Sequence, residues 1–222
     1  LLFNNRIYGL TKGQYSPTSE LGKITKSTPM GSADAPFNPL SLALGAEATF
    51  VARTIDSDRQ HLHSVLRAAA EHRGSAFVEI YQNCNIFNDG AFEPLKNPAT
   101  RDDYLIRLEH GRPITFGSEG QWCVVHPQGG FGLQVRPTAE VDPDDIVVHD
   151  AGVAEPAYAF ALSRLAGPDL RHTPIGVLRK VERPTYDDLV REQIATAKQE
   201  HTGTPEEQLA ELLASGDTWT IN

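Results

Sequence analysis

The segment PLSLALGAEATFVARTIDSDRQHLHSVLRAAAEHRGSAFVEIYQ, residues 39–82, alternates between helical and extended patterns. Pro39 begins a helix through LSLALGAEA, and ATFVART, residues 48–54, is a short apolar strand. Asp56 or Ser57 is expected to cap the next helix, whose apolar face is formed by Leu62, Val65, Leu66 and Ala69. AFVEIYQ is the following strand. This alternation predicts an α/β fold with a mostly parallel sheet flanked by crossover helices.

The regions before and after this segment do not show the same alternation of helix and strand. Residues 1–8 are expected to end a buried strand, and residues 9–40 are a long loop rich in Gly, Ser, Thr and Pro. Loops of this length in compact domains often carry function. Beyond residue 95 we expect an extension of short strands and then helices, at 114–116, 122–126, 131–136, 153–165 and 187–200, with a last helix capped by Thr204 and Glu207. The sequence therefore predicts two parts, residues 1–95 and 96–222.

The composition of the chain makes several classes of partner and location poor candidates. The chain has 222 residues and a formal net charge of −9, without a long basic run, so nucleic acid and anionic membranes are poor partners. Two cysteines suit a reducing cytoplasm, and no apolar run approaches the roughly 18 residues of a membrane span. The chain begins with an apolar run that leads directly into a Gly-containing turn. We therefore expect that an N-terminal portion precedes it in the whole protein.

The most informative motif is NNRIYGLTKGQYSPTSELG, residues 4–22. Mg²⁺ prefers hard oxygen ligands, and the Asn5 side chain and the carbonyl two residues later lie on the same side of an extended chain. Exposed N–H groups and the hydroxyls of Thr11, Ser16 and Thr18 suit phosphate oxygens. On the residues alone, a plain strand-to-loop corner in which Asn forms a turn is the favoured interpretation, because short motifs often occur without the function.

The motif resembles the thiamine-diphosphate loop of β subunits in the 2-oxoacid:ferredoxin oxidoreductase family. This chain matches every fixed position of the family pattern N-x-x-Y-G-L-T-x-G-Q-x-S-P-T. The resemblance implies a thiamine-diphosphate-binding fold, with Asn5 and the main chain of Ile7 as Mg²⁺ ligands and cofactor contacts from Tyr8, Gly9, Leu10 and Thr11. It also implies that residues 1–95 are the C-terminal part of the cofactor domain. The third Mg²⁺ ligand of the family, an Asp in Gly-Asp-Gly, has no counterpart in this chain.

Leu10 and Lys12 correspond to family positions near the bound 2-oxoacid. A Lys ammonium suits the distal carboxylate of 2-oxoglutarate, which favours 2-oxoglutarate as the substrate. Exposed loop Lys residues are common, however, and pyruvate or another 2-oxoacid stays an alternative. No catalytic base is expected here, because the family's activating glutamate comes from the partner subunit.

Cys84 follows the strand at 76–82, at the edge where α/β ligand sites form. On its own, a single Cys is more often a small buried residue. The resemblance implies that Cys84 is the fourth ligand of a 4Fe–4S cluster, whose other three cysteines lie outside this chain. Cys123 is expected in the core, and the helical pair His61 and His63 on a solvated surface. GGFGLQV, residues 129–135, is expected to form a hairpin.

The resemblance implies coenzyme A-dependent oxidative decarboxylation of 2-oxoglutarate to succinyl-CoA, with electrons passing through the cluster to ferredoxin. The expected cofactors are thiamine diphosphate, Mg²⁺ and the 4Fe–4S cluster. The expected partners are an α subunit, the rest of the β subunit and ferredoxin, in an (αβ)₂ assembly. A non-catalytic assembly module of the same fold is the alternative from another functional class.

Overall fold

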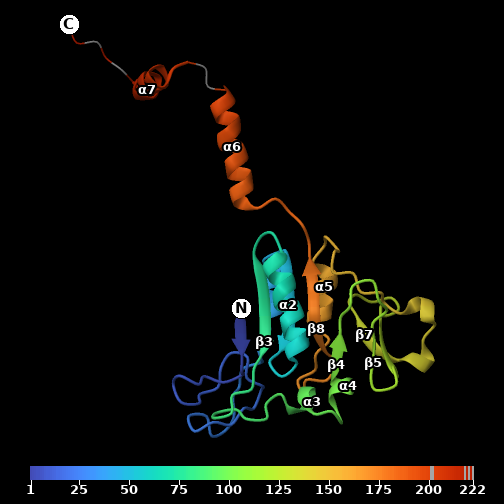
Figure 1. The fold of residues 1–222 in the computed structure, drawn as a ribbon. Helices are drawn as coiled ribbons and strands as arrows, with labels where there is room; N and C mark the ends of the chain where they lie inside the picture. Colours follow the sequence, from blue (N-terminus) through green and yellow to red (C-terminus); the bar gives the residue numbers. More distant parts are fainter. Residues whose placement is uncertain (201–202, 218, 220, 222) are drawn as a thin grey trace. The chain divides into compact units, whose positions relative to one another are not determined.

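The computed structural model describes residues 1–200, 203–217, 219 and 221. Its contacts divide the chain into two compact units, Leu1–Glu182 and Arg183–Asn222. A five-stranded sheet in the order β1–β3–β2–β8–β4 forms the centre of the first unit (Figure 1). Its strands are β1 (Leu2–Asn4), β2 (Phe50–Ile55), β3 (Ala76–Tyr81), β4 (Leu105–Arg107) and β8 (Thr173–Lys180). All neighbouring strands pair in parallel except β2 and β8, which confirms the predicted mostly parallel sheet.

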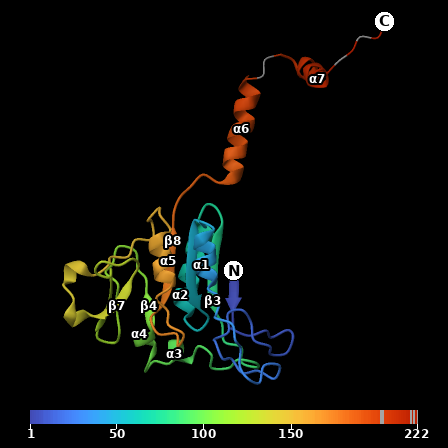
Figure 2. The ribbon, with the colours of Figure 1, turned by 180° about the vertical axis from the view of Figure 1, so that it is seen from behind.

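Helices cover both faces of this sheet. Helix α2 (Arg59–Glu71) lies in front of it in Figure 1, whereas α1 (Pro39–Gly45) and α5 (Ala157–Ser163) lie on the face seen in Figure 2. The fully buried strand β2 explains both contacts, because successive side chains of a strand point to opposite faces. Val51 packs in the cluster of α1 and α5, and its neighbours Phe50 and Ala52 pack in the cluster of α2.

The expected helix–strand alternation is confirmed, with local corrections. The side chain that caps α2 is Asp58, not Asp56 or Ser57, and it accepts a hydrogen bond from the His61 N–H. Strand β1 is only three residues long, and Phe3 is exposed while Asn4 and Ile7 are buried, so the buried strand end expected at residues 1–8 is confirmed in part. The sequence did not predict β4 or β8.

A second, antiparallel sheet follows α3 (Glu93–Lys96), α4 (Arg101–Tyr104) and β4. It contains β5 (Thr115–Phe116), β6 (Trp122–Val125) and β7 (Gln134–Pro137), which confirms the predicted small antiparallel unit. Residues 129–132 lie in the connection of the β6–β7 hairpin, and Cys123 is buried, as expected. The turns Thr138–Glu140 and Pro143–Asp145 complete this region.

The contacts do not divide the chain between residues 95 and 96, where the sequence placed a boundary. Both β4 and β8 come from beyond that point, and β8 pairs directly with the central strand β2. The region after residue 95 therefore completes the sheet of the region before it, and the division falls after Glu182.

The second unit contains α6 (Tyr186–Glu200) and α7 (Pro205–Leu213). Thr204 and Glu207 form the expected capping box of α7, with bonds of 2.7 and 3.2 Å in the two directions. Across the residues that the structure describes, a helix with the length and apolarity needed to span a bilayer does not occur.

Candidate functional site

The two motifs that the sequence singled out lie at the same edge of the sheet. Strands β1 and β3 are parallel neighbours, with Asn4 opposite Tyr81, so their carboxyl ends meet. The β1 loop (residues 5–19) and the β3 loop (residues 83–90) leave the sheet there and lie side by side in Figures 1 and 2. Ligand sites of open α/β sheets form at this edge.

The corner after β1 consists of two overlapping asparagine turns. The Asn4 side-chain oxygen accepts from the Arg6 N–H at 3.1 Å, and that of Asn5 accepts from the Ile7 N–H at 3.3 Å. Arg6 has a φ of 55°, in the left-handed region. Asn5 and Ile7 are therefore brought together by a turn and not, as expected, by an extended chain. The turn-forming role of Asn, which the sequence left open, is present as well.

The corner keeps oxygen atoms available for a hard cation. The Asn5 Oδ1 atom has only the long bond to the Ile7 N–H, and the Ile7 carbonyl accepts no hydrogen bond from the described residues. The peptide oxygens on either side are engaged: that of Asn5 accepts from Asn88 at 2.9 Å, and that of Arg6 accepts from Ser19 at 2.6 Å. One amide and one carbonyl oxygen at a fixed turn fit two ligands of Mg²⁺.

The next turn presents backbone donors. Tyr8 and Gln14 form a bridge that closes it, and the Lys12 N–H donates to the Gly9 carbonyl at 3.1 Å. The N–H groups of Gly9, Leu10 and Thr11 donate no hydrogen bond within the described residues. Leu10 is 94% exposed, and Lys12 is exposed with a φ of 78°. Successive free N–H groups form a concavity suited to an anion such as a diphosphate.

The hydroxyls of this loop are used internally. Thr18 donates to the Asn4 side chain at 2.7 Å, Ser19 donates to the Arg6 carbonyl, and Ser16 contacts both Thr18 and Ser19. Thr11 donates to the Gln14 side chain at 2.5 Å. The hydroxyls that the sequence assigned to phosphate therefore brace the loop in this structure.

Cys84 is half-buried in the β3 loop. Hydrogen bonding to the Phe87 N–H, with further N–H groups of Ile86 and Asn88, holds the pKa of its thiol below the ordinary value despite some burial and the nearby Asp89 carboxylate. Hydrogen bonds to the charged form favour a thiolate, the form that binds metals. The Asn83 side chain joins the start of the loop to its end, because its oxygen accepts from the Gly90 N–H at 3.0 Å and its nitrogen donates to the Asp89 carboxylate at 2.8 Å. The site fits one thiolate ligand of a cluster.

A buried ion pair is connected to the corner through Asn4, and the sequence did not predict it. Arg53 of β2 donates to Glu79 of β3 at 2.7 Å, and Glu79 also accepts from Asn4 of β1 at 2.7 Å. Arg53 also lies over the Tyr81 ring. The sequence did contain a signal for this pair: Arg53 and Glu79, which have opposite charges, each lie in a strand predicted to be buried, and buried charges are usually paired.

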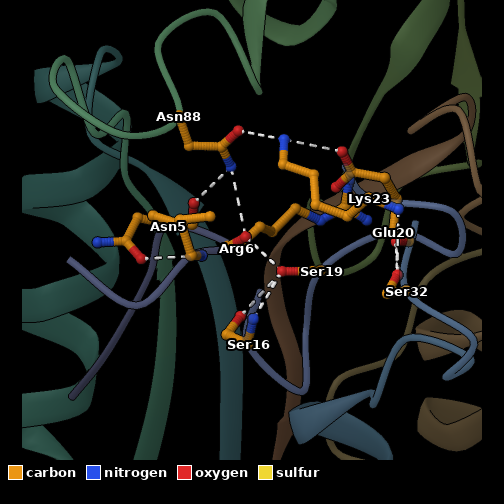
Figure 3. Close-up of polar contacts among 9 residues, drawn as sticks. Asn5, Arg6, Ser16, Ser19, Glu20, Lys23, Ser32 and Asn88 are labelled. Carbon is orange, nitrogen blue, oxygen red and sulfur yellow. Dashed lines mark hydrogen bonds and ion pairs between the residues drawn. The ribbon is translucent and has the colours of Figure 1, made fainter. Parts of the chain in front are cut away.

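A second missed group connects the two loops (Figure 3). Asn88 is buried; its side-chain nitrogen donates to the Asn5 carbonyl at 2.9 Å, and its side-chain oxygen accepts from Lys23 at 2.5 Å. Lys23 also pairs with Glu20 at 3.0 Å. No local pattern indicated the side-chain contacts of Asn88, since they join it to residues 65 and 83 positions away in sequence.

The histidines expected on the helix surface differ from each other. His63 is exposed, as expected, but His61 is half-buried and bonds Thr54 at 2.8 Å, so it is not solvated. Burial lowers the pKa of His61, as does the nearby Arg107. Among the described residues, no three His, Cys, Asp or Glu side chains gather in a metal-binding group.

The chain is similar to known proteins in sequence. Residues 1–80 match the family model described as the thiamine pyrophosphate enzyme, C-terminal TPP binding domain. The chain is 60% identical to the 2-oxoglutarate oxidoreductase subunit KorB of Mycobacterium tuberculosis, over 100% of this chain and 58% of that protein. It is 43% identical to the β subunit of a 2-oxoacid:ferredoxin oxidoreductase of Saccharolobus solfataricus, over 40% of this chain and 29% of the relative.

A solved structure is similar as well. It is a 2-oxoglutarate:ferredoxin oxidoreductase from Magnetococcus marinus with 2-oxoglutarate, coenzyme A and succinyl-CoA bound. The match has a TM-score of 0.62 and 26% identity, and covers 95% of this chain and 56% of that chain. The chain thus spans little more than half the length of these two relatives. In its sequence and its fold, the chain is thus similar to the β subunits of 2-oxoacid:ferredoxin oxidoreductases.

Proposed function

We propose that this chain is part of the β subunit of a cytoplasmic 2-oxoglutarate:ferredoxin oxidoreductase. The enzyme converts 2-oxoglutarate and coenzyme A to succinyl-CoA and CO₂ and passes two electrons to ferredoxin. The observation that carries the proposal is the meeting of the Asn5–Ile7 corner and the Cys84 loop at one sheet edge. Relatives named for this reaction support it.

The β1 loop holds the diphosphate end of thiamine diphosphate. The Asn5 side chain and the Ile7 carbonyl supply two Mg²⁺ ligands, and Tyr8, Gly9, Leu10 and Thr11 form the surrounding contacts. The free N–H groups at Gly9, Leu10 and Thr11 and the unbonded Ile7 carbonyl support these roles within the described residues. When bound, the cofactor supplies the carbon nucleophile that permits decarboxylation.

Cys84 supplies one thiolate to a 4Fe–4S cluster, and the other three come from the remaining part of the β subunit. Its N–H surroundings support this role, because such hydrogen bonds tune cluster cysteines. The active assembly contains an α subunit, as (αβ)₂, and reduces ferredoxin.

Leu10 and Lys12 recognise the 2-oxoacid. Both side chains are exposed on the turn next to the Asn5–Ile7 corner, and Lys12 carries a charge that suits the distal carboxylate of 2-oxoglutarate. The bound 2-oxoglutarate named for the Magnetococcus structure supports this substrate over pyruvate.

The test uses the complete αβ enzyme. Lys12→Met should raise the KM for 2-oxoglutarate about tenfold and leave the KM for pyruvate unchanged, since one charge-assisted hydrogen bond is lost. Lys26→Met, at another exposed loop lysine, is the matched control. An unchanged ratio of the two KM values would remove Lys12 from substrate recognition.

The wider proposal has a test of its own. The purified complex should contain iron and absorb broadly near ~400 nm, with bleaching on addition of 2-oxoglutarate and coenzyme A. A colourless complex that lacks iron would contradict the assignment.

A further inference from the structure

The β1 loop and the β3 loop are joined by one buried side chain. Asn88 lies in the β3 loop, where its N–H donates to the Cys84 carbonyl at 3.0 Å. Its side-chain nitrogen crosses to the β1 loop and reaches the carbonyls of Asn5 at 2.9 Å and Arg6 at 3.4 Å (Figure 3). Asn88 therefore contacts the main chain beside both of the groups that the proposed function uses.

Lys23 fixes the orientation of this amide. The ammonium donates to the Asn88 side-chain oxygen at 2.5 Å and pairs with Glu20 at 3.0 Å, and its side chain is largely buried. An ammonium has only donors, so the amide oxygen must face Lys23 and the amide nitrogen must face the two carbonyls. Figure 3 shows this row from Glu20 through Lys23 and Asn88 to Asn5.

An apolar contact supports the same junction. Phe87, next to Asn88, lies so close to Gly13 of the β1 loop that a Cβ on Gly13 would come within 3.0 Å of the ring. The neighbouring residues Phe87 and Asn88 of the β3 loop thus both contact the β1 loop, Phe87 by packing its ring against Gly13 and Asn88 by a hydrogen bond to Asn5. A side chain at position 88 without donors would leave the half-buried Asn5 carbonyl without this hydrogen bond.

We propose that Asn88 is a positioning residue that sets the Asn5–Ile7 corner and the Cys84 loop in one geometry, so that cofactor binding and electron transfer to the cluster depend on the same amide. This inference rests on the proposed function. It predicts that loss of the Asn88 donors weakens Mg²⁺–thiamine diphosphate binding and slows cluster reduction together.

The experiment uses the complete αβ enzyme with three variants. Asn88→Ala removes every side-chain contact, and Asn88→Asp keeps the volume and the Lys23 bond but cannot donate to the carbonyls. Lys23→Met keeps the donors but frees the amide to rotate. Asn97→Ala is the control: it removes an exposed asparagine whose side chain only accepts the Ala99 N–H at 3.0 Å.

Two quantities are measured. The first is the Kd of thiamine diphosphate at fixed Mg²⁺, by calorimetry on cofactor-depleted enzyme. The second is the rate of cluster reduction after 2-oxoglutarate is added, by rapid-freeze paramagnetic resonance. Asn88→Ala and Asn88→Asp should each raise the Kd about tenfold and slow reduction. Lys23→Met should change both quantities less, and Asn97→Ala should change neither.

Several results would overturn the inference. If the Asn88→Asp variant had the same Kd and reduction rate as the parent enzyme, the hydrogen bonds that Asn88 donates would have no effect on either quantity. If the Kd or the reduction rate changed alone, Asn88 would serve a single loop. If neither Asn88 variant assembled, the Lys23→Met variant would provide the test. A Kd and a reduction rate equal to those of the parent enzyme in that variant would then count against the inference. Absence of a cluster or of cofactor binding in the parent enzyme would instead refute the proposed function.

Discussion

Glu79→Gln tests whether the buried ion pair holds β1 against the sheet. Glu79 is fully buried, and its two oxygens accept from Arg53 and Asn4 at 2.7 Å each. In the glutamine variant one of these donors faces an NH₂ group, and the Arg53 charge loses its counter-charge. Among the described residues Glu79 is the acidic side chain that pairs with Arg53, and the Arg53 Nη1 atom is already buried without a hydrogen bond.

The expected loss follows from this geometry. Breaking a buried pair by removing one charge costs about 3–5 kcal/mol. For a chain of this size each kcal/mol shifts Tm by roughly 2–4 °C, so Glu79→Gln should lower Tm by about 6–20 °C. The double variant Arg53→Met, Glu79→Leu should recover at least half of that loss, because no unpaired charge remains.

Thermal unfolding followed by circular dichroism at pH 7 measures these shifts. The control is Glu140→Gln, which removes a carboxylate whose partner Arg136 lies 3.1 Å away with both side chains about half exposed. Its cost should stay below about 1 kcal/mol. If Glu79→Gln melted within the control's range, the pair would contribute little, and β1 would be held by its backbone pairing with β3 alone.

Two further predictions concern the β1 loop and pH. Gly13→Ala should raise the thiamine diphosphate Kd of the αβ enzyme at least tenfold, because the φ of 101° costs an L residue about 1–2 kcal/mol and the added Cβ would press on Phe87. Adding Phe87→Leu to this variant should recover part of the lost affinity. If it recovers none, contact with the Phe87 ring is not a cause of the loss. His149 is buried between Tyr158 and the Val177 carbonyl, and burial lowers its pKa below 6.5. The unfolded chain therefore takes up the proton first, and stability present above pH 6.5 is lost as pH falls toward the lower folded pKa. Denaturant unfolding should show that the free energy of unfolding falls less between pH 7 and pH 5 in His149→Gln than in the parent chain. An equal fall in the two chains would refute this role of His149.

The sequence predicted the parts of the fold that depend on local periodicity. The apolar face of α2 and the strands around it follow from patterns within a few residues, so they were found. Strand β8 was missed because Pro174 and Gly176 resemble strand breakers. The structure explains Gly176: its φ is 119°, and a Cβ there would lie 2.8 Å from the Leu108 carbonyl. That close approach depends on a neighbour 68 positions away in the chain, which no local pattern records.

The candidate site divides in the same way. Asn5 and Cys84 could be named because the motif at residues 4–22 resembles the loop of a known family, whereas residue type and position at strand ends alone favoured a turn-forming Asn and a small buried Cys. Their roles stay predictions, but the structure places both at one sheet edge. Asn88 and Lys23 could not be named, because an amide and an ammonium acquire a role only from the groups that they contact.

The β1 loop separates the groups that brace it from the groups that are free to bind. Its hydroxyls at Ser16, Thr18 and Ser19 turn inward to the corner, while the Ile7 carbonyl and the N–H groups of residues 9–11 keep unused capacity within the described chain. A loop fixed by its own side chains loses little further conformational entropy when a ligand binds, which strengthens affinity. The hydrogen bonds of these hydroxyls strengthen binding only if they form before the cofactor binds. Removing the Ser19 hydroxyl should therefore weaken cofactor binding, because it removes the hydrogen bond that fixes the Arg6 carbonyl.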